Sequence, residues 1–363
     1  MEAEGKKVYV GMSGGVDSSV SAHLLKEAGY DVTGVFIKVW QPDWIQCSAT
    51  EDRLDAMRVA AKLEIPFKTL DLESVYKKEV VDYMVSEYER GRTPNPDVFC
   101  NKEVKFGAFL DWALAEGSDY VATGHYAQST QGESGAFRIE MGNDPNKDQS
   151  YFLWTVTQEK LQHILFPVGH LPKSDVRKIA ERAGLVTAQK KDSQGLCFVG
   201  KIDLKEFLSH FVTEKDGVVL NVEGEEIGKH SGALFYTLGQ RHGFTITKKT
   251  PTDAPYFVVD KNISTNTIVV AQKNTEGELP GEVSSVVLSQ VNWISDIPKE
   301  GESVLVRFRY RQNLSSAKVF ISESDVRVIF DTPISSVPEG QSLVVYRDKV
   351  MLGGGVIEQT IED

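Results

Sequence analysis

A short glycine-rich segment near the N-terminus limits most strongly what this chain can fold into. Residues 7–12 form an apolar run suited to a buried strand, and the sequence SGGVDS follows at residues 13–18. An apolar stripe then predicts a helix over residues 18–28. Gly14 and Gly15 carry no Cβ, so their N–H groups can face an anion lying at the positive end of that helix. The segment therefore predicts a phosphate-binding loop between a strand and a helix.

The type of loop indicates which phosphate chemistry to expect. No lysine follows the glycines, so the Walker pattern is excluded. Ser13 and Ser18 add hydroxyl donors, and Asp17 is a candidate for holding the magnesium ion of a bound pyrophosphate. The segment resembles the SGGxDS loop of the N-type ATP pyrophosphatases, which split ATP between its α and β phosphates and adenylate an oxygen. A plain strand–turn–helix corner is the alternative, and six specified residues in the right context disfavour it.

Strand and helix patterns alternate through the first third of the chain. Further strands are expected at residues 31–37, 67–72 and 119–123, and Ser74 is expected to cap a helix running to about Arg90. This order predicts a parallel sheet with helices on both faces. Ligands of such sheets bind beyond the carboxyl ends of the strands, where the loop and the sharpest motifs fall.

The 363 residues are too many for one typical core, and the sequence changes character after about residue 200. Glycines there punctuate short segments, and later strands are expected at residues 303–310, 316–321, 326–330 and 342–346. We expect an α/β domain over residues 1–205, a small central domain over 206–278 and a β-barrel over 279–363.

Composition excludes several classes of protein. The net charge of −12 argues against a uniformly basic coat but leaves room for a local basic groove. No apolar run approaches membrane-spanning length and no secretory or transit segment is visible, so a cytoplasmic protein is expected. Cys47, Cys100 and Cys197 form neither a disulfide framework nor a C-x-x-C zinc motif. No metal is expected other than magnesium bound together with ATP.

Two of the cysteines have suggestive neighbours. Pro94 and Pro96 are expected to block helix formation and to hold Asp97 and Cys100 on a stiff loop, with lysines close to the thiol. Cys197 follows two lysines and a glycine in KKDSQGLCF, residues 190–198, an environment that favours a nucleophilic thiolate. A structural loop and a core cysteine are the alternatives. The presence of both blocks in one α/β domain favours thiol chemistry.

Two polar segments are candidates for nucleic-acid contact. NDPNKDQSY at residues 143–151 is too polar for a core and fits either a contact or a solvated turn. Strand alternation would place Arg307, Arg309 and Arg311 on one face with Tyr310 opposite, suited to phosphate contact and base stacking. A plain solvated strand fits equally well.

These blocks together resemble the bacterial tRNA-specific 2-thiouridylases over nearly the whole chain. The resemblance is carried by GMSGGVDSS at 11–19, the 93–101 block, ATGHY at 122–126, KDQSYFL at 147–153, KDSQGLCF at 191–198, TLGQR at 237–241, RYR at 309–311 and LGGG at 352–355. The loop alone identifies a superfamily, and the two cysteine blocks are specific to this family.

The resemblance implies ATP- and magnesium-dependent adenylation of the C2 oxygen of the wobble uridine, position 34, followed by sulfur transfer that gives 2-thiouridine in tRNAs for Lys, Glu and Gln. Cys197 would carry the persulfide, Cys100 would be the second catalytic cysteine, and Asp97 the general acid and base. A transient Cys100–Cys197 disulfide would form. The expected partners are tRNA and a cysteine desulfurase or sulfur-relay protein, and a monomer is expected.

The resemblance also assigns binding residues. ATP would contact Gly11, Met12, Ser13, Gly14, Gly15, Val16, Asp17, Ser18, Ile37 and Gly124. Transfer RNA would contact Asn95, Pro96, Asp97, His125, Lys147, Asp148, Gln149, Arg309, Tyr310 and Gln341.

Two other functions remain open at this point. A synthetase or amidotransferase acting on a small molecule could use the same loop, but no glutaminase segment supplies ammonia. A non-catalytic tRNA-binding protein could hold a nucleotide for structure, which would leave the two cysteine blocks unexplained. The residues do not decide between direct persulfide transfer and release of hydrosulfide in the pocket.

Overall fold

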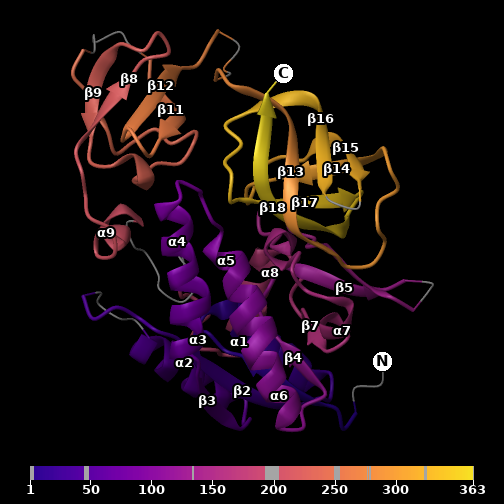
Figure 1. The fold of residues 1–363 in the computed structure, drawn as a ribbon. Coiled ribbons are helices and arrows are strands. Elements are labelled where there is room, and N and C mark those ends of the chain that lie inside the picture. Colours follow the sequence, from indigo (N-terminus) through magenta and orange to yellow (C-terminus); the bar gives the residue numbers. More distant parts are fainter. Residues whose placement is uncertain are drawn as a thin grey trace.

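The computed structural model describes residues 4–44, 49–132, 135–192, 204–248, 254–275, 277, 279–322 and 325–362. Figure 1 shows three parts: a sheet with helices at the bottom, a small sheet at the upper left and a barrel at the upper right.

The first part is built on a parallel sheet, as the sequence predicts. Its five strands lie in the order β3-β2-β1-β4-β7. Their bounds are β1 Lys7–Gly11, β2 Asp31–Lys38, β3 Phe67–Asp71, β4 Tyr120–Ala122 and β7 Ile164–Leu165. Val8 and Val10 pack on one face and Tyr9 on the other, each within a separate core. Helices therefore cover both faces of the sheet.

Three helices cover the face of Val8 and Val10: α1 Val16–Glu27, α2 Ala49–Lys62 and α8 Lys173–Arg182. A continuous helical rod on the opposite face consists of α3 Glu73–Tyr76, the π-helical η1 Lys77–Asp82 and α4 Tyr83–Glu89. The expected cap at Ser74 is wrong, because the rod begins at Glu73 after Leu72. The Asp71 carboxylate accepts a hydrogen bond from the Glu73 N–H at 3.0 Å and so satisfies a free donor of the first turn.

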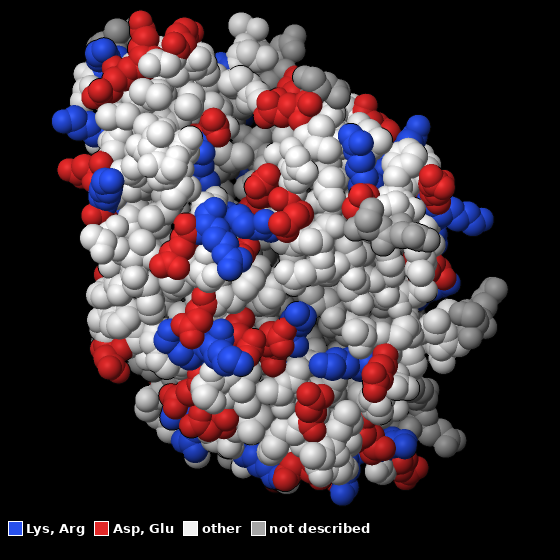
Figure 2. All heavy atoms as spheres, in the orientation of Figure 1, with Lys and Arg blue, Asp and Glu red and all other residues white. Residues whose placement is uncertain are grey.

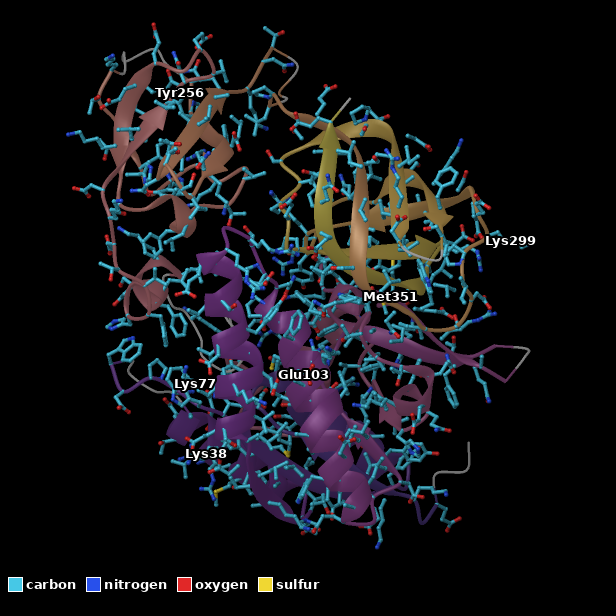
Figure 3. All side chains as sticks on the ribbon, viewed as in Figure 1. Lys38, Lys77, Glu103, Tyr256, Lys299 and Met351 are labelled. Atoms are coloured by element: carbon cyan, nitrogen blue, oxygen red, sulfur yellow. The ribbon has the colours of Figure 1, made fainter. Side chains whose placement is uncertain are left out.

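A second rod on this face contradicts the expected stiff loop around Cys100. This rod, called the Pro96 rod below, runs through α5 Pro96–Phe99, the π-helical η2 Cys100–Phe109 and α6 Leu110–Ala115. Pro96 is compatible with a helix start, since the first N–H of a helix has no partner within it. The Asn95 side chain caps the rod by accepting a hydrogen bond from the Val98 N–H at 3.3 Å. Glu103, labelled in Figure 3, lies on the front of this rod.

The C-terminal part is a closed barrel, as the sequence predicts. Its strands are β13 Glu282–Trp293, β14 Glu302–Arg307, β15 Ser315–Ile321, β16 Val326–Ser335, β17 Ser342–Arg347 and β18 Val350–Glu362. Strand β13 pairs with both β16 and β18, which closes the sheet on itself.

The expected alternation from Arg307 to Arg311 is wrong because β14 ends at Arg307. The Gln312 side-chain oxygen accepts hydrogen bonds from the N–H groups of Phe308 and Arg309, at 3.0 and 3.1 Å. Arg311 has a φ of 63°, in the left-handed region. The chain therefore turns after Arg307, and the following side chains do not share a strand face.

A hairpin from the first 205 residues extends the barrel sheet. Strands β5 Ala127–Gln131 and β6 Phe137–Met141 form the hairpin, and β6 pairs with β18 through Ile139 opposite Met351. Figure 3 labels Met351 at this seam, below the barrel. Short helices η3 Ser150–Leu153 and α7 Gln158–Leu161 follow in the chain. The barrel is thus joined to the first part by a shared sheet.

The central part begins with α9 Leu204–Ser209 and contains the short helix η4 Ala233–Phe235. Its sheet has the order β10-β9-β8-β12-β11. The strands are β8 Gly217–Leu220, β9 Glu226–His230, β10 Thr245–Ile246, β11 Tyr256–Asn262 and β12 Thr267–Gln272. Within the described ranges, no helix combines the length and the apolar character needed to cross a membrane.

Candidate nucleotide and tRNA site

A cavity of about 620 Å³ lies where the parallel sheet, the Pro96 rod and the barrel meet. Its wall includes residues of the SGGVDS loop, Ile37 at the end of β2, and Gly124 after β4. The structure thus brings the motifs that follow three strands to one place, at the carboxyl edge of the sheet. Tyr310 and Arg311 of the C-terminal part belong to the same wall.

Two glycines let the backbone pack closely around the loop. Gly14 has a φ of 74°, and a Cβ there would lie 2.3 Å from the Asp52 carbonyl oxygen of α2. A Cβ on Gly124 would lie 2.7 Å from the backbone nitrogen of Ser18. Gly15 precedes α1 and has no side chain that could accept hydrogen bonds from the first N–H groups of the helix. The N-terminal end of α1 therefore faces a loop that is suited to an anion.

Asp17, in the first turn of α1, is held by two groups. The Tyr126 hydroxyl donates a hydrogen bond to Asp17 Oδ1 at 2.7 Å, and Lys173 Nζ lies 2.7 and 2.8 Å from the two carboxylate oxygens. Burial and the Asp17 charge raise the pKa of Tyr126 above its ordinary value. Sequence reasoning missed Lys173, because it lies in none of the motifs. Among the described residues, no three His, Cys, Asp or Glu side chains are placed to bind a metal together.

Asp192 joins three cations beside the loop. Its carboxylate lies 2.6 Å from Lys147 Nζ, 2.9 Å from Lys173 Nζ and 2.7 Å from Arg177 Nη2. Burial alone would raise the pKa of Asp192, but the hydrogen bonds from Lys147 and Lys173 outweigh burial and lower it to about 2. Lys147, an expected tRNA contact, is therefore ion-paired while it lines the cavity.

The Pro96 rod presents one face to the cavity. Asp97, Asn101 and Lys105, spaced four residues apart, all line the wall. Cys100 lies on the same rod but is fully buried and is not a wall residue. Cys197 lies outside the described residues, and so does any pairing of Cys100 with it.

Asn95 and Gln341 connect the start of this rod to the barrel. Asn95 Nδ2 donates hydrogen bonds to Gln341 Oε1 at 3.3 Å and to the Tyr151 hydroxyl at 3.4 Å. Gln341 Nε2 donates to the Pro94 carbonyl oxygen at 3.1 Å. These two expected tRNA-contacting residues are thus already bonded to each other. Pro96, another expected contact, follows Asn95 in the first turn of the rod.

His125 and Gln149, two further expected tRNA contacts, line the cavity. Burial, with a smaller contribution from the Lys105 charge, lowers the pKa of His125 well below its usual value, so the ring is neutral at pH 7. Its Nδ1 lies 2.7 Å from the Thr123 hydroxyl. Gln149 Oε1 accepts a hydrogen bond from the Tyr126 N–H at 3.0 Å.

Asp148 and Arg309 hold the parts of the molecule together. Asp148 is buried against Arg307 and accepts a hydrogen bond from the Gly142 N–H at 3.0 Å. Arg309 Nη2 donates to the carbonyl oxygens of Leu238, at 2.8 Å, and Ser336, at 2.9 Å. The buried Asp148 carboxylate is used within the protein and does not present itself to an outside ligand in this structure.

Tyr310 is the aromatic group of the barrel that faces the cavity. Its ring centroid lies 4.8 Å from that of Phe152, another wall residue, and the Arg311 guanidinium lies 5.1 Å from the Tyr310 ring. Figure 2 shows basic side chains in small groups beside acidic ones, with a hollow between the central sheet and the barrel. Any basic groove on this face is local, in keeping with the net charge of −12.

Comparison with known proteins agrees with this arrangement. Residues 6–201 match a family described as tRNA methyl transferase HUP domain, residues 205–272 its PRC-barrel domain, and residues 283–357 an aminomethyltransferase beta-barrel domain. A protein of Streptococcus agalactiae named tRNA-specific 2-thiouridylase MnmA is 46% identical over 361 residues, covering 98% of this chain and 96% of that protein. The chain belongs to the tRNA-specific 2-thiouridylase family. A member from Streptococcus thermophilus is 47% identical, with the same coverage of both chains.

A solved structure with a partial likeness is the U34-tRNA thiolase NcsA from Methanococcus maripaludis. It is 18% identical to this 2-thiouridylase family member, with a TM-score of 0.36, and the match covers 58% of this chain and 65% of the other.

Proposed function

We propose that this protein makes 2-thiouridine at the wobble position of tRNA, using ATP to activate the C2 oxygen of uridine 34. The observation that carries the proposal is the shared cavity. One wall holds a phosphate-type loop, another holds Asp97 on the Pro96 rod, and a third holds Tyr310 of the barrel. These three features around one space suit an enzyme that adenylates a nucleic-acid base.

The activation step uses the carboxyl edge of the sheet. ATP binds with its phosphates at the SGGVDS loop and its adenine near Ile37 and Gly124. The uridine C2 oxygen attacks the α-phosphorus, pyrophosphate leaves, and Asp97 takes the uridine N3 proton. The loop N–H groups stabilise the charge of the departing pyrophosphate. Carboxylate oxygens such as those of Asp17 suit Mg²⁺, which when bound supplies charge neutralisation on the phosphates.

The sulfur step uses the two thiols. The terminal sulfur of a Cys197 persulfide attacks C2, and AMP leaves. Cys100 as thiolate then attacks the Cys197 sulfur of the bridge, which leaves 2-thiouridine and a Cys100–Cys197 disulfide. In the alternative route, Cys100 attacks the persulfide first and releases hydrosulfide, which attacks C2. Both routes require the buried Cys100 side chain to become accessible during the reaction.

The substrates and partners follow from the family. We propose tRNAs for Lys, Glu and Gln as substrates and a cysteine desulfurase or sulfur-relay protein as the donor, acting on a monomer. The expected tRNA contacts that the structure supports best are those that line the cavity: Asp97, His125, Lys147, Gln149 and Tyr310. Asp148 and Arg309 would act by holding the barrel in place.

Mass spectrometry of nucleosides tests the proposal. Transfer RNA is incubated with the protein, ATP, magnesium, and a cysteine desulfurase with L-cysteine, which supplies persulfide sulfur to Cys197. 2-Thiouridine is expected only when ATP is present. Cys100→Ser and Cys197→Ser are each expected to abolish thiolation while ATP binding survives. Robust product from either variant would sink the two-thiol scheme. No product from the wild-type protein would favour a small-molecule synthetase or a non-catalytic tRNA-binding protein.

A further inference from the structure

The phosphate loop lacks a cation of its own. Residues 11–19 contain neither Lys nor Arg, and Asp17 places a carboxylate in the first turn of α1. A negative charge at this point opposes the binding of a polyphosphate unless a neighbouring group neutralises it. The cation that neutralises Asp17 therefore decides whether the loop can accept ATP.

Lys173 is placed to be that cation. It is the first residue of α8, and its backbone N–H donates to Asp144 Oδ2 at 3.0 Å, which fixes the start of the helix. Only 11% of its side chain is exposed, and its Nζ lies within 2.9 Å of oxygens of both Asp17 and Asp192. Both carboxylates line the cavity, so the ammonium lies within hydrogen-bond distance of two wall residues.

The surrounding charges allow Lys173 to move. Asp192 keeps Lys147 and Arg177 as partners if Lys173 turns away. Asp17 keeps the hydrogen bond from the Tyr126 hydroxyl. A lysine ammonium is a compact charge on a flexible stem, so it can exchange one oxygen partner for another without moving its backbone.

We propose that Lys173 is a phosphate-binding residue of this site. Asp17 and Asp192 hold its ammonium beside the loop before the nucleotide arrives. The ammonium then exchanges its contact with Asp192 for oxygens of the ATP polyphosphate and stays on Asp17. Lys173 thereby supplies the positive charge that a lysine within the loop supplies in Walker sites, and it stabilises the pyrophosphate that leaves. The inference rests on the proposed use of ATP and adds a residue that the sequence motifs do not indicate.

Binding measurements on Lys173→Met test the inference by asking whether the loss of affinity is confined to ligands that carry phosphates. Isothermal titration compares adenosine, ATP with magnesium, and inorganic pyrophosphate. The variant is expected to bind ATP and pyrophosphate about 10- to 100-fold more weakly, the size of a lost hydrogen bond to a charged group. Adenosine binding should change by less than about twofold, which is within ~0.4 kcal/mol. Lys178→Met is the matched control, since Lys178 is an exposed lysine of the same helix paired with Asp175.

The outcomes separate this inference from the proposed function. An equal loss for adenosine and ATP, or unchanged ATP binding with only a lower melting temperature, would show a structural role and overturn the inference. A wild-type protein that binds ATP no better than adenosine would overturn the proposed function and this inference with it. Lys173→Arg repeats the comparison with the charge retained if the Met variant does not fold, and a smaller loss that still grows with phosphate content is expected.

Discussion

Arg307 of β14 and Asp148, just before η3, form an ion pair in which the side chains are only 7% and 5% exposed. The Arg307 guanidinium also donates to the Tyr346 hydroxyl at 2.8 Å and to the Ser150 hydroxyl at 3.1 Å. The pair thus joins the barrel to the segment around Lys147 and Gln149, which lines the cavity. Both charges are buried away from water.

Arg307→Met should destabilise the protein by about 3–5 kcal/mol, because it leaves the Asp148 charge buried without a partner. Urea unfolding measures the change. Arg327→Met is the control, since Arg327 is exposed and bonds to the Ser285 hydroxyl. The double variant Arg307→Met/Asp148→Asn should recover part of the loss. A loss below about 1 kcal/mol for Arg307→Met would contradict the buried-charge account.

Gly14→Ala should abolish ATP binding, because its Cβ would overlap the Asp52 carbonyl oxygen and displace the loop from α2. Gly29→Ala isolates the cost of the backbone conformation. Gly29 has a φ of 90°, and a Cβ there would meet nothing within 4 Å. We expect Gly29→Ala to lose about 1 kcal/mol of stability and to keep its ATP affinity. Equal ATP affinity in the two variants, measured by titration, would show that close packing at Gly14 is unimportant.

Lys261 should make the protein more stable as the pH rises. Burial lowers its pKa to about 8, against an opposing effect of Glu339, and its Nζ donates to the Tyr236 carbonyl oxygen at 2.7 Å. Between pH 8 and the ordinary lysine pKa, the unfolded chain holds a proton that the folded chain has released. The free energy of unfolding should therefore increase over this window, by up to roughly 3 kcal/mol.

The free energy of unfolding of the Lys261→Met variant should not show this increase. Its difference from the wild-type value should be largest at pH 7. Urea midpoints at several pH values between 7 and 10 provide the measurement. The exposed Lys229, changed to Met, serves as the control and should follow the wild-type curve. Parallel curves for wild type and Lys261→Met would refute the assignment.

Gln341→Ala should slow thiolation without weakening ATP binding. The change removes the hydrogen bond that Gln341 donates to the Pro94 carbonyl and the one that it accepts from Asn95. These two bonds connect the barrel to the start of the Pro96 rod. Losing two neutral bonds predicts a fall in kcat/KM of about tenfold. Gln359→Ala, an exposed change in β18, should have no effect. A Gln341→Ala enzyme with full kcat/KM would show that this link does not position the site.

The loop and the parallel sheet could be predicted because their signals are local. A strand, two glycines and a helix follow one another within residues 7–28, and the structure confirms this order. The helix at Pro96 was also within reach, since an asparagine followed by proline is a common helix start. The prediction failed there because proline was read only as a helix breaker.

Other features depend on contacts that no local pattern reveals. Lys173 lies 156 positions from Asp17, so only the packing of α8 beside α1 identifies their pairing. The hairpin carried a signal, because Phe137, Ile139 and Met141 alternate with polar residues as in a half-buried strand. That pattern predicts a strand but not its partner β18, which lies more than two hundred residues later.

The hairpin β5–β6 also limits how the chain can be divided or recombined with that of a relative. Its strands lie in the chain between β4 and β7 of the parallel sheet, yet they extend the sheet of the barrel. Cutting the chain between its parts would leave β6 and β18 with unpaired backbone edges, which invite association with other chains. A chimaera that exchanges barrels between relatives must therefore carry residues 127–141 along with the barrel.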